Sequence, residues 1–226
     1  LYGLAYSIGM LVQLFISGMN SALTPWMYSK IKKGDIRSMR KVLQLLSVVV
    51  VGIAVALMLI SPELVLIFGS PKYREAVYVI PPVAASVFFI FIYNILSMPQ
   101  FYYEKTQFLM AASMAAAGAN VVLNFIFIRL FGYIAAGYTT LACYMLYSVG
   151  HYIVSKRILV NEGIQENLMS PGFLVACSAF LIGASIICNL IFPYRILRYA
   201  ILLASAGLVF WKKELLLKTM ADIRKK

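Results

Sequence analysis

The spacing of charged residues constrains this chain more than any other feature. Seven long stretches contain no Asp, Glu, Lys or Arg: 1–29, 42–62, 76–103, 106–128, 130–155, 167–194 and 199–211. Six of them reach the roughly 20 apolar residues that a helix needs to cross a bilayer core of about 30 Å. The seventh reaches that length if Arg198 and Lys212 extend their charged ends to the two interfaces. We therefore predict about seven transmembrane helices, at 2–27, 42–61, 77–98, 107–128, 132–155, 171–192 and 196–212.

The composition and the pattern of apolar residues indicate the fold class. Hydrophobic residues make up 62% of the chain and charged residues 12%, whereas a soluble domain has about 45–50% and about 25%. Transmembrane strands would alternate apolar and polar residues, but the run from Leu45 to Ile60 does not alternate. The sequence predicts an all-α integral membrane protein, with residues 1–226 forming a single transmembrane domain. An ordinary cytosolic enzyme and a disulfide-stapled secreted domain are excluded.

The positive charges indicate how these spans are oriented. If the spans alternate, 15 of the 20 Lys and Arg fall at 30–41, 99–105, 156–169 and 212–226. These four regions would lie on one side of the membrane. The remaining five basic residues would lie on the opposite side: Lys72, Arg74, Arg129, Arg195 and Arg198. Because short cytoplasmic loops are rich in Lys and Arg, we predict that the four basic regions are cytoplasmic. The net charge of +12 then reflects contact with anionic membrane lipids rather than nucleic acid. The first span would start outside, so we expect this chain to be the C-terminal part of a longer polypeptide.

Residues that carry enzyme chemistry are sparse in the predicted spans. The eight acids all fall at span ends or in loops: Asp35, Glu63, Glu75, Glu104, Glu162, Glu166, Glu214 and Asp222. This placement leaves no carboxylate pair within the bilayer, so we predict no enzyme activity, no metal site and no cofactor. It also argues against a proton or sodium site in this segment, because such sites place Asp or Glu at membrane depth.

The cysteines and the one histidine have structural interpretations. Cys143, Cys177 and Cys188 lie within predicted spans without CxxC spacing, so we interpret them as small apolar packing residues. His151 falls at the cytoplasmic end of the fifth span. We predict an interfacial side chain with its polar edge toward water; a role in proton coupling is the alternative.

Uncharged polar residues recur with helical spacing in four of the predicted spans. One face of the first span carries Gln13, Ser17, Asn20 and Thr24, and one face of the fifth carries Thr140, Tyr144, Tyr147 and His151. Ser113, Asn120 and Asn124 share a face of the fourth span, and Asn94 lies in the third. Such groups either join helices, contributing about 0.6–2 kcal/mol each, or line a hydrated cavity for a hydroxyl-rich solute. Our candidate substrate-cavity residues are Gln13, Ser17, Asn20, Asn94, Asn120, Asn124 and Tyr144.

Several segments, taken in order, resemble one family of membrane proteins. They are LYGLAYSIGM at 1–10, NSALTPWMY at 20–28, IPPVA at 80–84, NVVLNFIFI at 120–128 and FGYIAA at 131–136. This ordered set is similar to the bacterial flippases that export O-antigen and capsule repeat units. Those flippases belong to the multidrug/oligosaccharidyl-lipid/polysaccharide superfamily.

The resemblance implies a two-lobed flippase with a central cavity, of which this chain would supply the C-terminal lobe. The cargo would be a lipid-linked oligosaccharide, carried on undecaprenyl diphosphate and moved to the periplasmic leaflet of the cytoplasmic (inner) membrane. Its partner would be an N-terminal lobe of the same polypeptide, and we expect that lobe to hold the diphosphate because no mid-span cation is present here. A multidrug exporter of the same superfamily and a membrane glycan polymerase or ligase are the alternatives.

Overall fold

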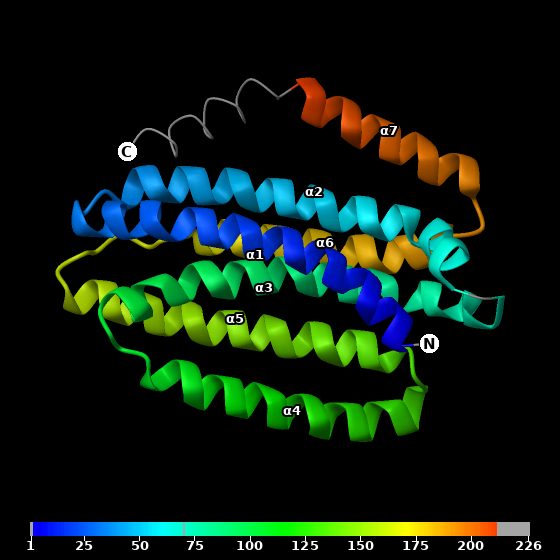
Figure 1. Ribbon diagram of the computed structural model, residues 1–226, viewed down its shortest axis with the longest axis horizontal. Coiled ribbons are helices and arrows are strands. Elements are labelled where there is room, and N and C mark those ends of the chain that lie inside the picture. Colours follow the sequence, from blue (N-terminus) through cyan, green and yellow to red (C-terminus); the bar gives the residue numbers. More distant parts are fainter. Residues whose placement is uncertain (1, 70, 212–226) are drawn as a thin grey trace.

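The computed structural model describes residues 2–69 and 71–211. Within these ranges the chain is helical and contains no strand, which confirms the all-α prediction (Figure 1). The helices are α1 (Tyr2–Lys32), α2 (Ile36–Phe68), the 3-10 helix η1 (Pro71–Tyr78), α3 (Ile80–Tyr102), α4 (Gln107–Phe131), α5 (Ala135–Asn161), α6 (Pro171–Ile191) and α7 (Arg195–Trp211). The predicted cytoplasmic region 212–226, and the last residue of the span 196–212, lie outside the described residues.

Five of the described stretches are long and apolar enough to cross a membrane. They are Tyr2–Lys32, Ile36–Phe68, Tyr73–Tyr102, Gln107–Phe131 and Pro171–Ile191. The helices α5 and α7 fall outside this set: α5 carries a polar stripe, and α7 has only 17 residues. The structure therefore supports a helical bundle that crosses the membrane several times, while the finer count of seven spans stays a prediction.

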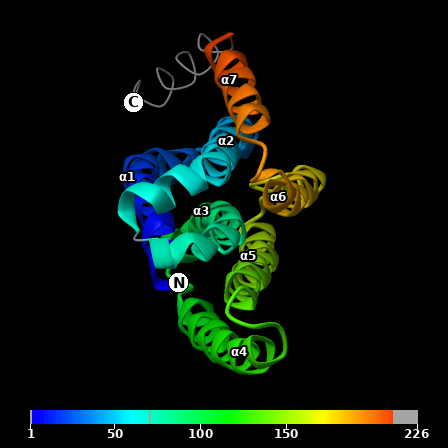
Figure 2. The ribbon, with the colours of Figure 1, turned by 90° about the vertical axis from the view of Figure 1, so that its right-hand side faces the viewer.

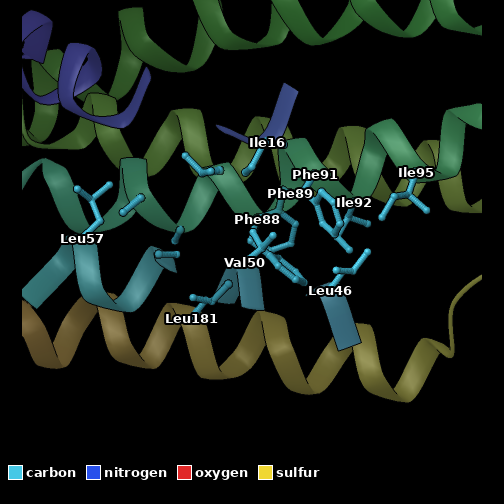
Figure 3. Packing of buried hydrophobic residues seen from close by; sticks show 14 of the residues in the cluster. Ile16, Leu46, Val50, Leu57, Phe88, Phe89, Phe91, Ile92, Ile95 and Leu181 are labelled. Atoms are coloured by element: carbon cyan, nitrogen blue, oxygen red, sulfur yellow. The ribbon is translucent and has the colours of Figure 1, made fainter. Parts of the chain in front are cut away.

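The helix α3 forms the centre of the bundle. It packs against α1, α2, α5 and α6, and the view along the bundle places it between the α1–α2 and α5–α6 pairs (Figure 2). The reason is its apolar run, in which Phe88 and Phe91 are completely buried. Both rings belong to one buried cluster with Leu46 and Val50 of α2 and Leu181 of α6 (Figure 3). A helix that is apolar on all sides is stable only when other helices or lipid cover every face.

Proline lies inside α2 without ending the helix. Pro62 has no N–H, so the Met58 carbonyl four residues earlier loses its helical donor. The Ser61 hydroxyl donates to the Met58 carbonyl at 2.8 Å, and Arg198 of α7 donates to the Leu59 carbonyl at 2.6 Å. The helix therefore continues beyond residue 61 to Phe68.

The position of Arg198 corrects one expectation. Instead of reaching an interface, this side chain is 3% exposed. Its guanidinium makes two hydrogen bonds to Glu63, at 2.8 and 2.9 Å, and the Tyr199 hydroxyl donates to the same carboxylate at 2.8 Å. The reason is that the Leu59 carbonyl and the Glu63 carboxylate of α2 lie together and both accept hydrogen bonds from the guanidinium. This ion pair ties the first turn of α7 to α2.

Removing the Arg198 side chain should weaken this attachment. Arg198→Leu leaves a partly buried Glu63 without its counter-ion, which should lower the free energy of unfolding by about 2–3 kcal/mol. The midpoint of thermal unfolding in detergent micelles measures the change. The double variant Arg198→Leu, Glu63→Leu should recover part of the loss. If the single and double variants unfold at the same temperature, the ion pair is not what holds α7 to α2.

Candidate functional site

A pocket of about 540 Å³ lies among α1, α3, α4 and α5. Its lining consists of Tyr2, Tyr6, Tyr93, Ser113, Ala116, Ala117, Asn120, Val121, Thr140, Cys143, Tyr144 and Tyr147. The room comes from α4, which presents the small side chains Ala116 and Ala117 where a larger residue would fill the space. Four helices thus border an open pocket whose polar lining consists of tyrosines, small hydroxyl residues and one amide.

Hydroxyl groups join the helices around this pocket. The Tyr2 hydroxyl of α1 shares a hydrogen bond of 2.9 Å with the Thr140 hydroxyl of α5. The Ser113 hydroxyl of α4 shares one of 2.8 Å with the Tyr147 hydroxyl of α5. Either group can donate in each pair, so each hydroxyl can also exchange its partner for a ligand hydroxyl.

Aromatic rings form the α3 and α5 sides of the pocket. The ring centroids of Tyr93 and Tyr147 lie 4.7 Å apart, and those of Tyr93 and Tyr144 lie 6.3 Å apart with nearly parallel planes. Ring faces of this kind present an electron-rich apolar surface. They suit either the C–H face of a sugar or an organic cation.

A chain of amide hydrogen bonds borders the pocket on α4. The Asn124 Nδ2 atom donates to Asn120 Oδ1 at 2.9 Å, one helical turn away. The Thr139 hydroxyl of α5 donates to Asn124 Oδ1 at 2.6 Å. Because Asn124 is held on both sides, it fixes the orientation of the Asn120 amide that lines the pocket.

The lining of this pocket carries no formal charge. None of the described residues that form it is Asp, Glu, Lys or Arg. Recognition in the pocket must therefore rest on hydroxyls, one amide and ring faces, which are the groups that pair with neutral polar ligands.

The structure separates the predicted cavity residues into two groups. Asn120 and Tyr144 line the pocket. Asn124 is not part of the lining, but its amide donates a hydrogen bond to Asn120. The α1 residues Gln13, Ser17 and Asn20, and Asn94 of α3, are not part of the lining; the positions on α1 are exposed or half-buried. Asn94 donates to the Ile90 carbonyl of its own helix at 2.8 Å.

The sequence matches a known family over more than half of its length. A family model described as MatE matches residues 1–126. The chain belongs to the MatE family. This family lies in the superfamily of flippases and multidrug exporters named in the sequence analysis, and its members are membrane transporters. No curated protein and no solved structure matches the chain. The match covers α1 to α3 and most of α4, so it includes every pocket residue except those of α5.

Several pocket residues of this MatE protein were not among the predicted ones. Tyr2 and Tyr6 lie one turn apart on α1 with ring centroids separated by 5.9 Å, and both line the pocket. Their i, i+4 spacing was visible in the sequence. The polar stripe predicted on this span begins only at Gln13, however, so it did not include these two tyrosines.

His151 of the MatE protein is not at an interface, which corrects a second expectation. Its side chain is completely buried, because Phe108 and Tyr147 cover the ring with centroids at 5.3 and 4.5 Å. The Gln100 amide nitrogen lies 2.8 Å from His151 Nδ1. An amide nitrogen can only donate, so Nδ1 accepts and the proton of the neutral imidazole is on Nε2.

Replacing His151 should destabilise the contact between α3 and α5. In His151→Leu the buried Gln100 amide loses this acceptor, so we expect the free energy of unfolding to fall by about 1–3 kcal/mol. Thermal unfolding in detergent measures the effect. The double variant His151→Leu, Gln100→Leu removes both polar partners and should be more stable than His151→Leu alone. A double variant that is less stable would contradict this account of the pair.

The cysteines of the MatE protein are free thiols in the described structure. Cys143 and Cys188 are buried and Cys177 is half-buried. No group of three or more His, Cys, Asp or Glu residues able to hold a metal ion occurs in the part of the chain that the structure describes.

Proposed function

We propose that this MatE protein moves a lipid-linked oligosaccharide across the bacterial cytoplasmic membrane. The carrier lipid would be undecaprenyl diphosphate, and the sugars would pass from the cytoplasmic to the periplasmic leaflet. The observation that supports this function is the neutral pocket of tyrosines, hydroxyls and an amide among α1, α3, α4 and α5.

The chemistry of the pocket suits a sugar. Each sugar hydroxyl both donates and accepts a hydrogen bond, and the hydroxyls of Ser113, Thr140 and Tyr147 and the Asn120 amide do the same. The ring faces of Tyr93 and Tyr144 offer surface for the apolar C–H faces of the sugar. A volume of about 540 Å³ lies within the range of about 300–1,000 Å³ that is typical of small-molecule sites.

The diphosphate needs a different environment from the sugars. An anion drawn into a low-dielectric cavity requires compensating cations, and none of the described lining residues supplies one. We propose that basic residues of an N-terminal lobe hold the diphosphate, in the two-lobed arrangement that the resemblance implies. This pocket would then hold only the neutral sugars.

Export of drug-like cations is the second candidate function, and one observation favours it. Tyrosine faces attract organic cations, and the pocket contains five tyrosines. A neutral lining has no carboxylate to compensate a cation, however, which makes the sugar the better ligand. A polymerase or ligase is a weaker candidate, because MatE proteins are transporters.

Transport by the purified protein in proteoliposomes distinguishes the candidates. One assay follows the appearance of the sugars of a polyprenyl-diphosphate-linked oligosaccharide on the opposite leaflet, where a glycosidase can reach them. A second assay follows the uptake of ethidium. Transfer of the glycolipid without transport of ethidium is the expected result. Transport of ethidium alone would contradict the proposed function and favour the exporter.

A further inference from the structure

Asn120 has hydrogen-bonding groups that the protein itself leaves unused. Among the described residues that line the pocket, it is the only one with a side-chain amide. Such an amide has two N–H donors and a carbonyl oxygen with two lone pairs. One lone pair is used, because Asn124 Nδ2 donates to Asn120 Oδ1 at 2.9 Å. The side-chain nitrogen of Asn120 makes no hydrogen bond within the described part of the chain.

The orientation of the Asn120 amide follows from the bonds behind it. The Thr139 hydroxyl has a single proton, and the closer of its two acceptors is Asn124 Oδ1, at 2.6 Å against 3.0 Å for the Ala136 carbonyl. With its oxygen engaged in this way, Asn124 turns its nitrogen toward Asn120. The Asn120 oxygen then points at Asn124, and the Asn120 nitrogen points away from it. Because hydrogen bonds in a chain strengthen one another, the free N–H groups of Asn120 are good donors.

Methyl-sized side chains lie beside Asn120 on α4. Ala116 and Ala117 precede it by about one helical turn and line the pocket with it. Spacings of three and four residues place these two alanines on the same face of the helix as Asn120. Val121 borders the pocket as well. A ligand that uses both features has a hydrogen-bond acceptor next to a small apolar group.

Three kinds of acceptor are common on sugars, and they suit this part of the pocket unequally. A carboxylate is an anion, and none of the described lining residues is Lys or Arg, so its desolvation would be costly. A hydroxyl accepts a hydrogen bond but brings no apolar group to cover the alanines. An acetamido group has both parts, because its carbonyl oxygen accepts and its methyl group is apolar.

We propose that the pocket is specific for an N-acetylated sugar. The carbonyl oxygen of the acetamido group accepts from Asn120 Nδ2, and its methyl group packs on Ala116 and Ala117. The acetamido N–H donates to a hydroxyl of the lining, since each of those hydroxyls has a lone pair to spare. The C–H face of the sugar ring lies on Tyr93 or Tyr144. This inference rests on the proposed function and names the class of sugar that the same pocket takes.

Saturation-transfer NMR on the full protein in detergent micelles tests this preference without transport. The two ligands are the methyl glycosides of N-acetylglucosamine and of glucose, which differ in one substituent. Asn120→Leu removes the donor, and Ala117→Val fills the space of the acetamido methyl group. Ala117 is exposed, so the larger side chain should leave the packing of the helices intact. Asn20→Leu is the matched control, because Asn20 is an amide of α1 outside the pocket lining.

We expect several-fold stronger saturation of the N-acetylated glycoside than of the glucoside, strongest at the acetamido methyl protons. The wild-type protein and Asn20→Leu should both show this difference, whereas Asn120→Leu and Ala117→Val should lose it. Equal saturation of the two glycosides by the wild-type protein overturns the inference. A difference that survives Asn120→Leu overturns it too, because the acetamido group is then recognised elsewhere.

Transfer in proteoliposomes separates this inference from the proposed function. Two polyprenyl-diphosphate-linked glycolipids are compared, one with N-acetylglucosamine and one with glucose. The N-acetylated lipid should move about tenfold faster or more, because a site built to hydrogen-bond a group rejects the analogue that lacks it. Equal rates overturn the sugar preference and leave the proposed function. Specific saturation without transfer of either glycolipid supports the sugar class and contradicts the proposed function.

Discussion

Replacing Asn124 with leucine should reduce the rate of glycolipid transfer about tenfold or more. The variant loses the bonds of 2.9 Å to Asn120 and 2.6 Å from Thr139, and so releases the Asn120 amide from its orientation in the pocket. The buried Thr139 hydroxyl and the half-buried Asn120 amide each lose this partner, a loss that costs about 1–3 kcal/mol for a buried group, and about 1.4 kcal/mol in an activation barrier corresponds to a tenfold change in rate. Transfer in proteoliposomes, at equal protein content, measures the effect.

Asn20→Leu is the matched control for this substitution. Asn20 is half-buried on α1 and is not part of the pocket lining, so its replacement should change the rate less than twofold, well below 1 kcal/mol. The amount of folded protein in the membrane is measured for both variants. If Asn124→Leu lowers abundance and transfer in the same proportion, the amide is a helix-packing group. If Asn20→Leu has the larger effect, the substrate contacts α1 instead of this pocket.

Thiol labelling from outside the cell should give an all-or-none difference between the two ends of the bundle. In a background in which the three native cysteines are replaced by alanine, Ser38→Cys should resist an impermeant thiol reagent, and Tyr194→Cys should react. Ser38 lies in the region of concentrated Lys and Arg that we assign to the cytoplasm, and it is exposed. Tyr194 is 64% exposed, in the turn between α6 and α7.

Permeabilised cells provide the control, because both positions should then react. This control separates a shielded thiol from an unreactive one. Labelling of Ser38→Cys, and not of Tyr194→Cys, in intact cells would reverse the orientation. The direction proposed for glycolipid movement would then be wrong as well, because it depends on which end of the bundle is cytoplasmic.

The helices were predictable because charge avoidance is a property of the sequence alone. A lysine in the middle of a span is energetically costly wherever the helix lies in the bundle, so charge-free stretches predict apolar helices without any tertiary information.

The polar stripes predicted only some of the residues that line the pocket. Spacing of three or four residues places Gln13 and Asn20 on one face, but it does not say which neighbour that face meets. The Asn120–Asn124 face meets α5, and the Gln13 face does not line the pocket.

The two corrected side chains depend on tertiary contacts that no local pattern contains. His151 lies near the end of a predicted span, where water was expected, but Phe108 of the preceding helix, α4, covers the imidazole. Arg198 was expected at an interface, but the Leu59 carbonyl and the Glu63 carboxylate of α2 bind its guanidinium. A sequence shows that Arg198 and Glu63 carry opposite charges, and it does not show that these distant residues meet.

A structure of the full protein with a polyprenyl-diphosphate-linked oligosaccharide bound tests the central claim most directly. The account predicts density for the sugars among α1, α3, α4 and α5, within hydrogen-bonding distance of Asn120 and in contact with the rings of Tyr93 and Tyr144. Sugar density along Gln13 and Asn20 of α1, with the tyrosine-lined pocket empty, would contradict it.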